Sequence, residues 1–294
     1  MSSANPLLFI GPSQNDSGLE INKAAAGNMN TLINETVLIT GASSGIGLEL
    51  AKCFAADGCR LVLVARNTEA LQSLAAELRQ THKIETFVLT ADLSLSETPA
   101  RIFKELQGRG IMVDVLVNNA GFGALGAFAE LPLKRQLEML QVNITALTEL
   151  TGLFLSGMIQ RRRGGILNVS SVAGFEPGPG MAIYHATKAY VLSFSEALAE
   201  ELIGTNVVVT AFCPGPTATN FGDVANFQKE RRLKKIPKMS AEKVAQYGHH
   251  AFRKSRVLAI PGLSNHLLVL LVKIMPRRYV RKIAKSFNST KNPA

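Results

Sequence analysis

Three residues with side chains suited to proton transfer lie near one another in the sequence: Ser171, Tyr184 and Lys188. Tyr184 and Lys188 are four residues apart in a segment expected to be helical, so both side chains lie on one face, one turn apart. A tyrosine hydroxyl, with a reference pKa of about 10, is a poor acid–base group near neutral pH. A neighbouring ammonium lowers that pKa, and a serine hydroxyl can hold an oxygen whose charge changes. We therefore predict acid–base chemistry on a carbonyl or hydroxyl oxygen.

A glycine-rich segment with the sequence TGASSGIG, residues 40–47, directly follows a short apolar run. Gly41 permits a tight turn out of a strand, Gly45 lets the backbone approach a pyrophosphate, and Gly47 lets the next helix pack closely on the sheet. The N-terminus of that helix offers free N–H groups and partial positive charge to phosphates. The predicted dinucleotide contacts in this loop are Gly41, Ser43, Ser44, Gly45, Ile46 and Gly47.

Arg66 follows the second apolar run, at the position where dinucleotide enzymes distinguish their cofactors. An acidic residue there would bind the ribose 2′-hydroxyl of NAD, whereas a guanidinium pairs with the 2′-phosphate of NADP. The sequence has Ala65, Arg66 and Asn67 at this point and no acid. We therefore expect NADP(H) to be preferred over NAD(H), with Ser43 as a second contact to the phosphate.

The elements that must position these residues alternate along the chain. Strands are expected at 36–40, 60–65, 85–91, 113–118, 165–170 and 206–213, and helices at 46–56, 68–81, 98–106, 132–162 and 182–203. The strand segments are apolar with little alternation, as in parallel sheets that are covered on both faces. The pattern predicts a doubly wound, Rossmann-like α/β domain over residues 34–260, after a flexible lead-in at 1–33. Its ligands would bind at the carboxyl ends of the strands, where the candidate residues lie.

At this point the chain resembles the short-chain dehydrogenase/reductase family, of the single-domain type. The matching motifs cover about residues 36–220: TGASSGIG at 40–47, Asp92-Leu93, NNAG at 118–121, Asn143, SS at 170–171, YHATK at 184–188 and CPGPTAT at 213–219. The lead-in and a long tail depart from the family pattern.

The resemblance implies a role for each matched position. Ser171, Tyr184, Lys188 and Asn143 would be catalytic, with Asn143 holding a water that relays protons from Lys188. Tyr184 and Lys188 would also contact the cofactor. Asp92 would bond the adenine amino group. The remaining implied cofactor contacts are Leu93, Asn118, Asn119, Ala120, Gly121, Pro214, Gly215, Thr217 and Thr219. A metal ion is not expected.

The net charge of +10 is concentrated at the C-terminal end. Between Val224 and the C-terminus there are 17 Lys or Arg residues and only two acids. Residues 261–294 are expected to form a basic, amphipathic, helical extension. It would lie in the plane of an anionic membrane surface, or close the pocket, pack on a second subunit or receive an acidic carrier. The residues before the first strand lack a secretory pattern, so we expect a cytoplasmic protein, with peripheral membrane contact left open.

The sequence thus predicts an NADP(H)-dependent oxidoreductase that interconverts a carbonyl and an alcohol by hydride transfer. The segment 221–239, with Phe122, Phe175 and Met181, suggests an apolar substrate pocket with a basic rim. A 3-oxoacyl-thioester reductase is the nearest alternative, and a catalytically silent NADP-binding sensor or scaffold is another. We expect a homodimer or homotetramer. Nucleic-acid binding is not expected, because no known module is present.

Overall fold

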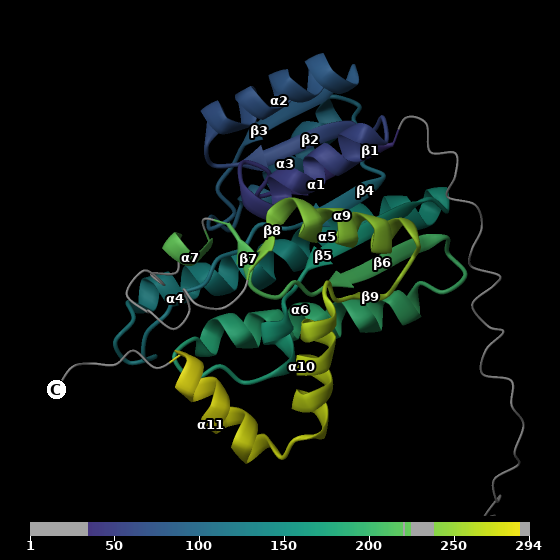
Figure 1. Cartoon of the computed structure of the whole chain (residues 1–294). Coiled ribbons are helices and arrows are strands. Elements are labelled where there is room, and N and C mark those ends of the chain that lie inside the picture. The colour runs from purple at the N-terminus through teal and green to yellow at the C-terminus, as the bar shows by residue number, and fades with distance from the viewer. Residues whose placement is uncertain (1–34, 220, 225–237, 289–294) are drawn as a thin grey trace, which may run out of the picture.

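The computed structural model describes residues 35–219, 221–224 and 238–288. Its main sheet has seven strands in the order β3-β2-β1-β4-β5-β6-β9, and all neighbouring strands are parallel. Figure 1 shows this sheet with helices on both faces. The order reverses between β1 and β4, which makes that edge the switch point of a doubly wound sheet. The predicted fold class is confirmed. The lead-in expected at 1–33 lies outside the described residues. So does most of the segment 221–239, which was expected to line the substrate pocket.

The strands form where short apolar, β-branched runs are buried on both faces. All five residues of β1 and all four of β4 are buried. The strands of the main sheet are β1 (Thr36–Thr40), β2 (Arg60–Ala65), β3 (Thr86–Thr90), β4 (Val115–Asn118), β5 (Gly164–Val169), β6 (Val207–Phe212) and β9 (Leu258–Ala259). A separate two-stranded sheet pairs β7 (Thr217–Ala218) with β8 (Met239–Ser240).

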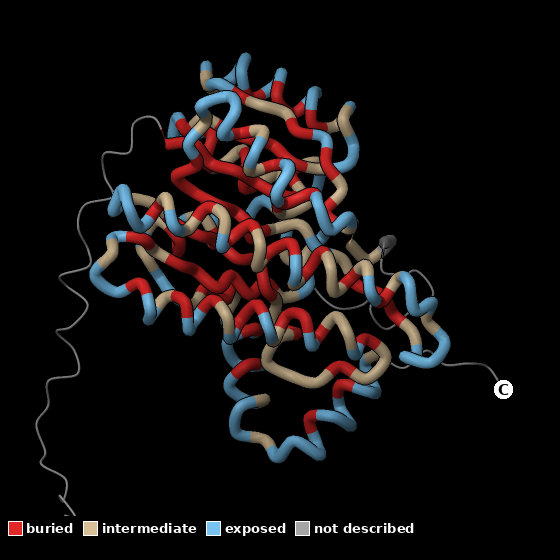
Figure 2. The backbone as a smooth tube through the Cα atoms, turned by 180° about the vertical axis from the view of Figure 1, so that it is seen from behind, coloured by how far each residue is buried: buried red, intermediate tan, exposed pale blue. Residues whose placement is uncertain are grey.

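Two apolar layers cover the two faces of the sheet. On one face pack α1 (Gly45–Ala56), α2 (Thr68–His82) and α9 (Ala241–Arg253). On the other pack α3 (Thr98–Gly108), α5 (Leu147–Arg161) and α6 (Ala182–Glu201). Figure 2 shows the buried residues concentrated in the strands and on the inner sides of these helices. The layers fix the sheet and leave the carboxyl ends of the strands open for a ligand.

The helix expected at 132–162 is continuous but not uniform. It consists of α4 (Leu133–Leu140), a π-helical turn η1 (Gln141–Ala146) and α5. Leu133–Arg161 is long and apolar enough to cross a membrane. In the fold, however, Leu150, Phe154 and Met158 pack against the sheet in the hydrophobic core. The π turn changes the direction of side chains within it, a feature that often accompanies functional sites.

Several elements after β6 were not expected from the sequence: the short elements β7, α7 (Phe221–Val224) and β8, helix α9 and strand β9. β9 extends the sheet by two residues, Leu258 and Ala259, beside β6. Helix α9 packs on α1 and is capped by Ser240, whose hydroxyl accepts a hydrogen bond from the Lys243 amide. The other predicted elements agree with the structure to within two residues at each end.

Residues 263–288 form a helical hairpin of α10 (Leu263–Ile274) and α11 (Arg277–Asn288). Figure 1 shows it as the yellow pair of helices that projects from the body next to α6. Val269 of α10 joins a small apolar cluster with Leu192, Cys213 and Ile260. The expected helical extension is therefore a helical pair anchored on the C-terminal end of the sheet.

Candidate active site

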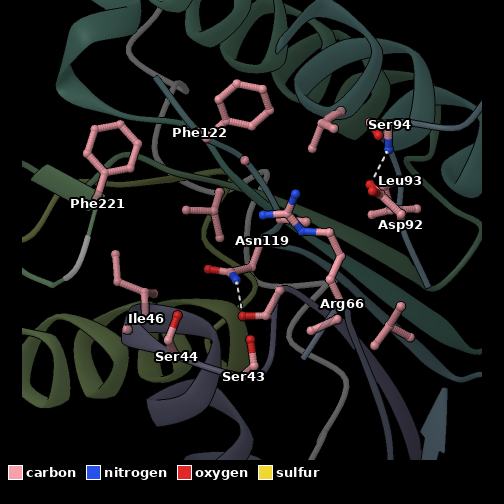
Figure 3. Close-up of a pocket in the computed structure, with 18 of the residues that line it drawn as sticks. Ser43, Ser44, Ile46, Arg66, Asp92, Leu93, Ser94, Asn119, Phe122 and Phe221 are labelled. Carbon is pink, nitrogen blue, oxygen red and sulfur yellow. Dashed lines mark hydrogen bonds between the residues drawn. The ribbon is translucent and has the colours of Figure 1, made fainter. Parts of the chain in front are cut away.

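A cavity of about 480 Å³ opens at the carboxyl ends of the parallel strands. Residues that directly follow β1, β2, β3 and β4 line it, together with the end of β5 and one face of α6. In Figure 3, Asp92, Leu93 and Ser94 lie toward one end of the pocket, and Phe122 and Phe221 lie toward the other. The cavity therefore runs across several strand ends, as a dinucleotide site at a switch point must.

The glycine loop forms the floor of this cavity and has no room for side chains at two positions. Gly41 has a φ of +67°, in the left-handed region, and a Cβ there would lie 2.8 Å from Asn119 Nδ2. A Cβ on Gly47 would lie 2.3 Å from the carbonyl oxygen of Gly41. These contacts keep the loop tight and bring the start of α1 against the sheet. The loop therefore packs closely on Asn119, while Ser43, Ser44 and Ile46 line the cavity.

Thr40 and Asn119 join the glycine loop to the strand beside it. The Thr40 hydroxyl accepts hydrogen bonds from the backbone amides of Asn119 and Ala120, each 3.0 Å long. The Asn119 side chain donates back to the Thr40 carbonyl at 2.8 Å and to the Gly41 carbonyl at 3.2 Å. Figure 3 shows Asn119 beside the glycine loop. The positioning role of Thr40 was not foreseen, although it is the first residue of the glycine motif.

Arg66 and Asp92 line the same part of the cavity. The Asp92 carboxylate accepts a 2.9 Å hydrogen bond from the Ser94 amide. Burial alone would raise the pKa of Asp92, but the bonds from Ser94 and the positive charge of Arg66 outweigh it, so the pKa lies below its usual value. Asp92 is thus ionised near neutral pH, and a guanidinium is available beside it for an anionic ligand.

Tyr184, Lys188 and Ser171 are brought together as the spacing predicted. Tyr184 and Ser171 share a side-chain hydrogen bond. Lys188 Nζ lies 5.8 Å from the centre of the Tyr184 ring and donates a 2.8 Å hydrogen bond to the carbonyl of Val169, the last residue of β5. Ser171 also donates to the Pro214 carbonyl at 3.3 Å. The three side chains therefore have fixed positions at the end of β5.

The acid–base properties of this trio differ from the sequence-based expectation. Lys188 was expected to lower the pKa of Tyr184. Instead, burial raises the pKa of Tyr184 to about 12, and only the hydrogen bond with Ser171 acts in the other direction. Burial also lowers the pKa of Lys188 to about 8. Removal from water disfavours both charged forms and is the largest cause of each shift. Tyr184 is therefore a protonated donor at neutral pH.

Asn143 lies in the π-helical turn η1 and points toward the site. Its amide donates to the carbonyl of Phe122 and its oxygen accepts from the Phe122 amide, at 3.0 and 3.1 Å. Gly121 separates it from Lys188: a Cβ on this glycine would lie 3.1 Å from Asn143 Oδ1 and 3.5 Å from Lys188 Nζ. Glycine at 121 thus keeps open the narrow space between these two polar groups.

The end of the cavity near Tyr184 is largely apolar. A Cβ on Gly123 would lie 2.9 Å from the Phe221 ring, 3.2 Å from Met181 and 3.3 Å from the Tyr184 ring. The Tyr184 and Phe221 ring centres are 5.3 Å apart. Phe221 and Met181 therefore give the cavity apolar surfaces near the Tyr184 ring.

Arg135 of α4 is a cavity residue that sequence reasoning missed. Its guanidinium lies 3.9 Å from the centre of the Phe122 ring, and it forms an ion pair with Glu138 at 3.7 Å. It lies six residues before the first residue of the π turn, Gln141, on a polar stretch with no motif, so no sequence pattern indicated it. Glu138 also lines the cavity, so this part of the wall carries an ion pair.

Most of the predicted cofactor residues line the cavity. Those that do are Gly41, Ser43, Ser44, Gly45, Ile46, Arg66, Asp92, Leu93, Asn119, Ala120, Gly121, Tyr184, Lys188 and Thr219. Gly47 packs beneath the loop, and Gly215 packs against Asn265 of α10. The Thr217 hydroxyl donates to the Gly215 carbonyl, and the Pro214 carbonyl accepts from Ser171.

Asn118 was expected along the cofactor, and the structure places it elsewhere. It is 3% exposed and its amide donates to Thr151 and Asn168 in the core. Neighbouring residues of a strand point in opposite directions, so only Asn119 of the pair faces the cavity. Among the described residues no cluster of three or more His, Cys, Asp or Glu side chains could hold a metal ion.

Comparison with known proteins agrees with this geometry. A very-long-chain 3-oxoacyl-CoA reductase of Laccaria bicolor is 38% identical over 174 residues, which cover 58% of this chain and 52% of that protein. The chain thus spans about half the length of this relative. A mouse very-long-chain 3-oxoacyl-CoA reductase is 31% identical over 88% of this chain and 81% of its own length.

Among solved structures, a short-chain dehydrogenase of Sphingobium yanoikuyae in complex with NADPH superposes with a TM-score of 0.73. It is 33% identical, and the match covers 82% of this chain and 96% of that one. The family model described as short chain dehydrogenase matches residues 35–230. These residues include the glycine loop, the Ser–Tyr–Lys trio and the Asn143 turn, and the chain belongs to the short-chain dehydrogenase/reductase family.

Proposed function

We propose that this protein is an NADP(H)-dependent oxidoreductase that interconverts a carbonyl and an alcohol on an apolar substrate. The observation that carries the proposal is the hydrogen bond between Tyr184 and Ser171, with Lys188 one helical turn away, at the wall of a cavity floored by the glycine loop. An ionisable trio held at a strand end has the arrangement that acid–base catalysis needs.

The cavity fits a phosphorylated dinucleotide. The glycine loop lines the cavity at the start of α1, and the Ser44 side chain makes no capping hydrogen bond there, so the first backbone N–H groups of α1 are available to a pyrophosphate. Arg66 would bind the 2′-phosphate, with Ser43 beside it, and Asp92 would accept a hydrogen bond from the adenine amino group. NADPH, when bound, supplies the hydride to the carbonyl carbon.

The residues of this chain bind the carbonyl oxygen of the substrate and transfer a proton to it. Ser171 donates a hydrogen bond to the carbonyl and holds it in line with the phenol. Tyr184, protonated at neutral pH, gives its proton to the oxygen as negative charge develops there. The Lys188 ammonium stabilises the phenolate that is left, and Asn143 holds the water through which the proton is replaced. In the oxidative direction each transfer is reversed.

The pKa shifts predict opposite pH profiles for the two directions. Because burial lowers the pKa of Lys188 to about 8, its ammonium loses a proton as the pH rises through that value. The pKa of Tyr184, at about 12, keeps the phenol protonated throughout. We expect kcat/KM for carbonyl reduction to be level below pH about 8 and to fall above it, and kcat/KM for alcohol oxidation to rise with pH. A reductive rate that increases through pH about 8 would contradict these assignments.

Replacing Arg66 with glutamine tests the cofactor preference. A charge-assisted hydrogen bond is worth about 1.5–3 kcal/mol, so KM for NADPH is expected to rise about tenfold to a hundredfold. KM for NADH should change little, because NADH has no 2′-phosphate. Arg101→Gln, which removes an exposed charge from α3, serves as the matched control. Equal changes with both cofactors would show that Arg66 has no part in recognising the phosphate.

A 3-oxoacyl thioester is the substrate class that the relatives favour. Both curated relatives described above are named very-long-chain 3-oxoacyl-CoA reductases. The apolar side chains near Tyr184 suit an acyl chain, and the Arg135 guanidinium, which is paired with Glu138, is a cavity-lining cation for an anionic carrier group. The direct test measures NADPH and NADH consumption with a panel of aldehydes, ketones and 3-oxoacyl thioesters. Tight NADPH binding without turnover of any member would favour the silent sensor or scaffold.

Assembly as a homodimer or homotetramer is part of the proposal. Leu133 and Leu137 of α4 are 63% and 54% exposed, and Tyr190 of α6 lies on the surface with its ring stacked on Phe194. Burial of such a surface between copies would stabilise an oligomer. Sedimentation analysis of the full chain would determine its mass.

A further inference from the structure

We propose that the α10–α11 hairpin, residues 263–288, binds the surface of anionic lipid bilayers. The inference starts from the apolar side chains of α10 that the body of the protein does not cover. Leu263 is 90% exposed, Ile274 is 70% exposed, and Leu267 and Leu270 are each 56% exposed. Their spacing of four, three and four residues puts all four on one face of the helix.

The opposite side of α10 is the side that packs on the protein. Asn265 and Val269 are buried there, and the Asn265 amide donates a 2.6 Å hydrogen bond to the carbonyl of Pro261. Lys273 lies 5.7 Å from the centre of the Phe175 ring, which also belongs to the body. The exposed row therefore faces away from the body, and Figure 2 shows the hairpin mostly in the exposed colour. An exposed row of apolar side chains such as this one marks a contact surface for another apolar surface.

Helix α11 has its polar and apolar residues on separate sides. Tyr279, Ile283 and Phe287 recur every four residues, and all three are about half exposed. The basic residues occupy the other side. They are Arg277, Arg278, Arg281, Lys282 and Lys285, all exposed. A helix with Lys and Arg on one side and aromatic and aliphatic residues on the other has the composition of helices that lie in a membrane interface.

Charge favours a lipid surface over a second copy of the chain. With Lys273 the hairpin carries six Lys or Arg residues, and no acidic residue occurs from Gly262 to the C-terminus. A two-fold contact through this face would bring two such basic sets together without an acid to neutralise them. In a bilayer surface, anionic headgroups neutralise the basic residues, and the acyl chains beneath them bury the apolar rows. An acidic carrier protein would match the charge but not two rows of exposed apolar side chains.

The hairpin ends beside the substrate side of the active site. A Cβ on Gly180 would lie 2.8 Å from the backbone oxygen of Asn288, the last residue of α11. The next residue, Met181, is one of the apolar side chains around Tyr184. Docking of the hairpin would thus place the entrance for a lipophilic substrate next to the bilayer. This consequence rests on the proposed function, whereas lipid binding itself does not.

The test is co-sedimentation of the full chain with two kinds of vesicle, pure phosphatidylcholine and phosphatidylcholine mixed with phosphatidylglycerol. We expect binding to the mixed vesicles and little to the neutral ones. Lys282→Gln with Lys285→Gln should weaken binding about 30-fold, since each basic residue near an anionic surface contributes ~1 kcal/mol. Arg101→Gln with Lys104→Gln, an exposed pair at the same spacing on α3, should bind as the unaltered protein does.

A second pair of variants tests the apolar row. Leu267→Gln with Ile274→Gln should abolish most vesicle binding, while Met112→Gln with Ile203→Gln, which removes two exposed apolar residues elsewhere, should not. All variants should keep their helical circular dichroism and their turnover of a short, soluble carbonyl. Equal binding to both kinds of vesicle, or to neither, would overturn the proposal. So would a dimer that dissociates when the row is substituted, because the face would then be a contact between copies.

Discussion

Tyr184→Phe is expected to reduce carbonyl turnover by about 10²–10⁴-fold, the usual contribution of a positioned general acid. The ring still fills its place beside Phe221, with the two centres 5.3 Å apart in the unaltered protein, so the fold and the cavity are kept. Only the hydroxyl that bonds Ser171 is lost. Binding of NADPH, measured by fluorescence titration, should change by less than the activity does.

Tyr190→Phe is the matched control for this substitution. Tyr190 lies on the same helix and its hydroxyl bonds Thr148 at 3.0 Å on the protein surface. Its loss should leave kcat within the error of the assay. If both variants retained full turnover, proton transfer by Tyr184 would be excluded. If both bound NADPH as before and the unaltered protein had no turnover, the scaffold function would gain support.

Lys188→Met is expected to lower kcat/KM by about 10²-fold or more, within the range of a group that acts in proton transfer. The substitution keeps an unbranched side chain in a buried position but removes the ammonium that bonds the Val169 carbonyl at 2.8 Å. Without that charge a phenolate at Tyr184 is less stable. We also expect weaker NADPH binding, because Lys188 lines the cavity in which the dinucleotide is proposed to bind.

Kinetics and binding together separate these roles. Lys104→Met, at an exposed position on α3, controls for the change of residue type. Circular dichroism should show that both proteins are folded. Unchanged kcat/KM in Lys188→Met would contradict the account of both the trio and the pH profile. Loss of activity with unchanged NADPH binding would limit the role of Lys188 to the stabilisation of the phenolate.

Most of the sheet could be predicted from the sequence because its strands are continuous apolar runs. β9 could not, because Leu258 and Ala259 form a strand only by pairing with β6, a contact with no local signature. Helix α9, in contrast, has a local signature, because Val244, Gly248, Ala251 and Phe252 recur at helical spacing after the Ser240 cap. The π turn depends on packing around Asn143 and has no pattern of its own.

The sequence predicted the site residues that belong to motifs at strand ends. It predicted less well which side chains face the cavity and how burial changes their pKa values. Asn118 and Asn119 are adjacent and chemically identical, yet one is in the core and the other faces the cavity. Sequence spacing predicted that Tyr184 and Lys188 are neighbours. It could not give the sign of the pKa shift of Tyr184, because that depends on how completely the hydroxyl is removed from water. Arg135 enters the cavity only through the tertiary fold.

The most direct test of hydride transfer follows a deuterium label at C4 of the nicotinamide. NADPH carrying the label on one face, and then on the other, is incubated with the full chain and a long-chain 3-oxoacyl-CoA, and the product is analysed by mass spectrometry. The account predicts a 3-hydroxyacyl product that carries deuterium from one labelled face only, and no labelled product with Tyr184→Phe. Binding of NADPH without label in any alcohol product, across the whole carbonyl panel, would contradict it.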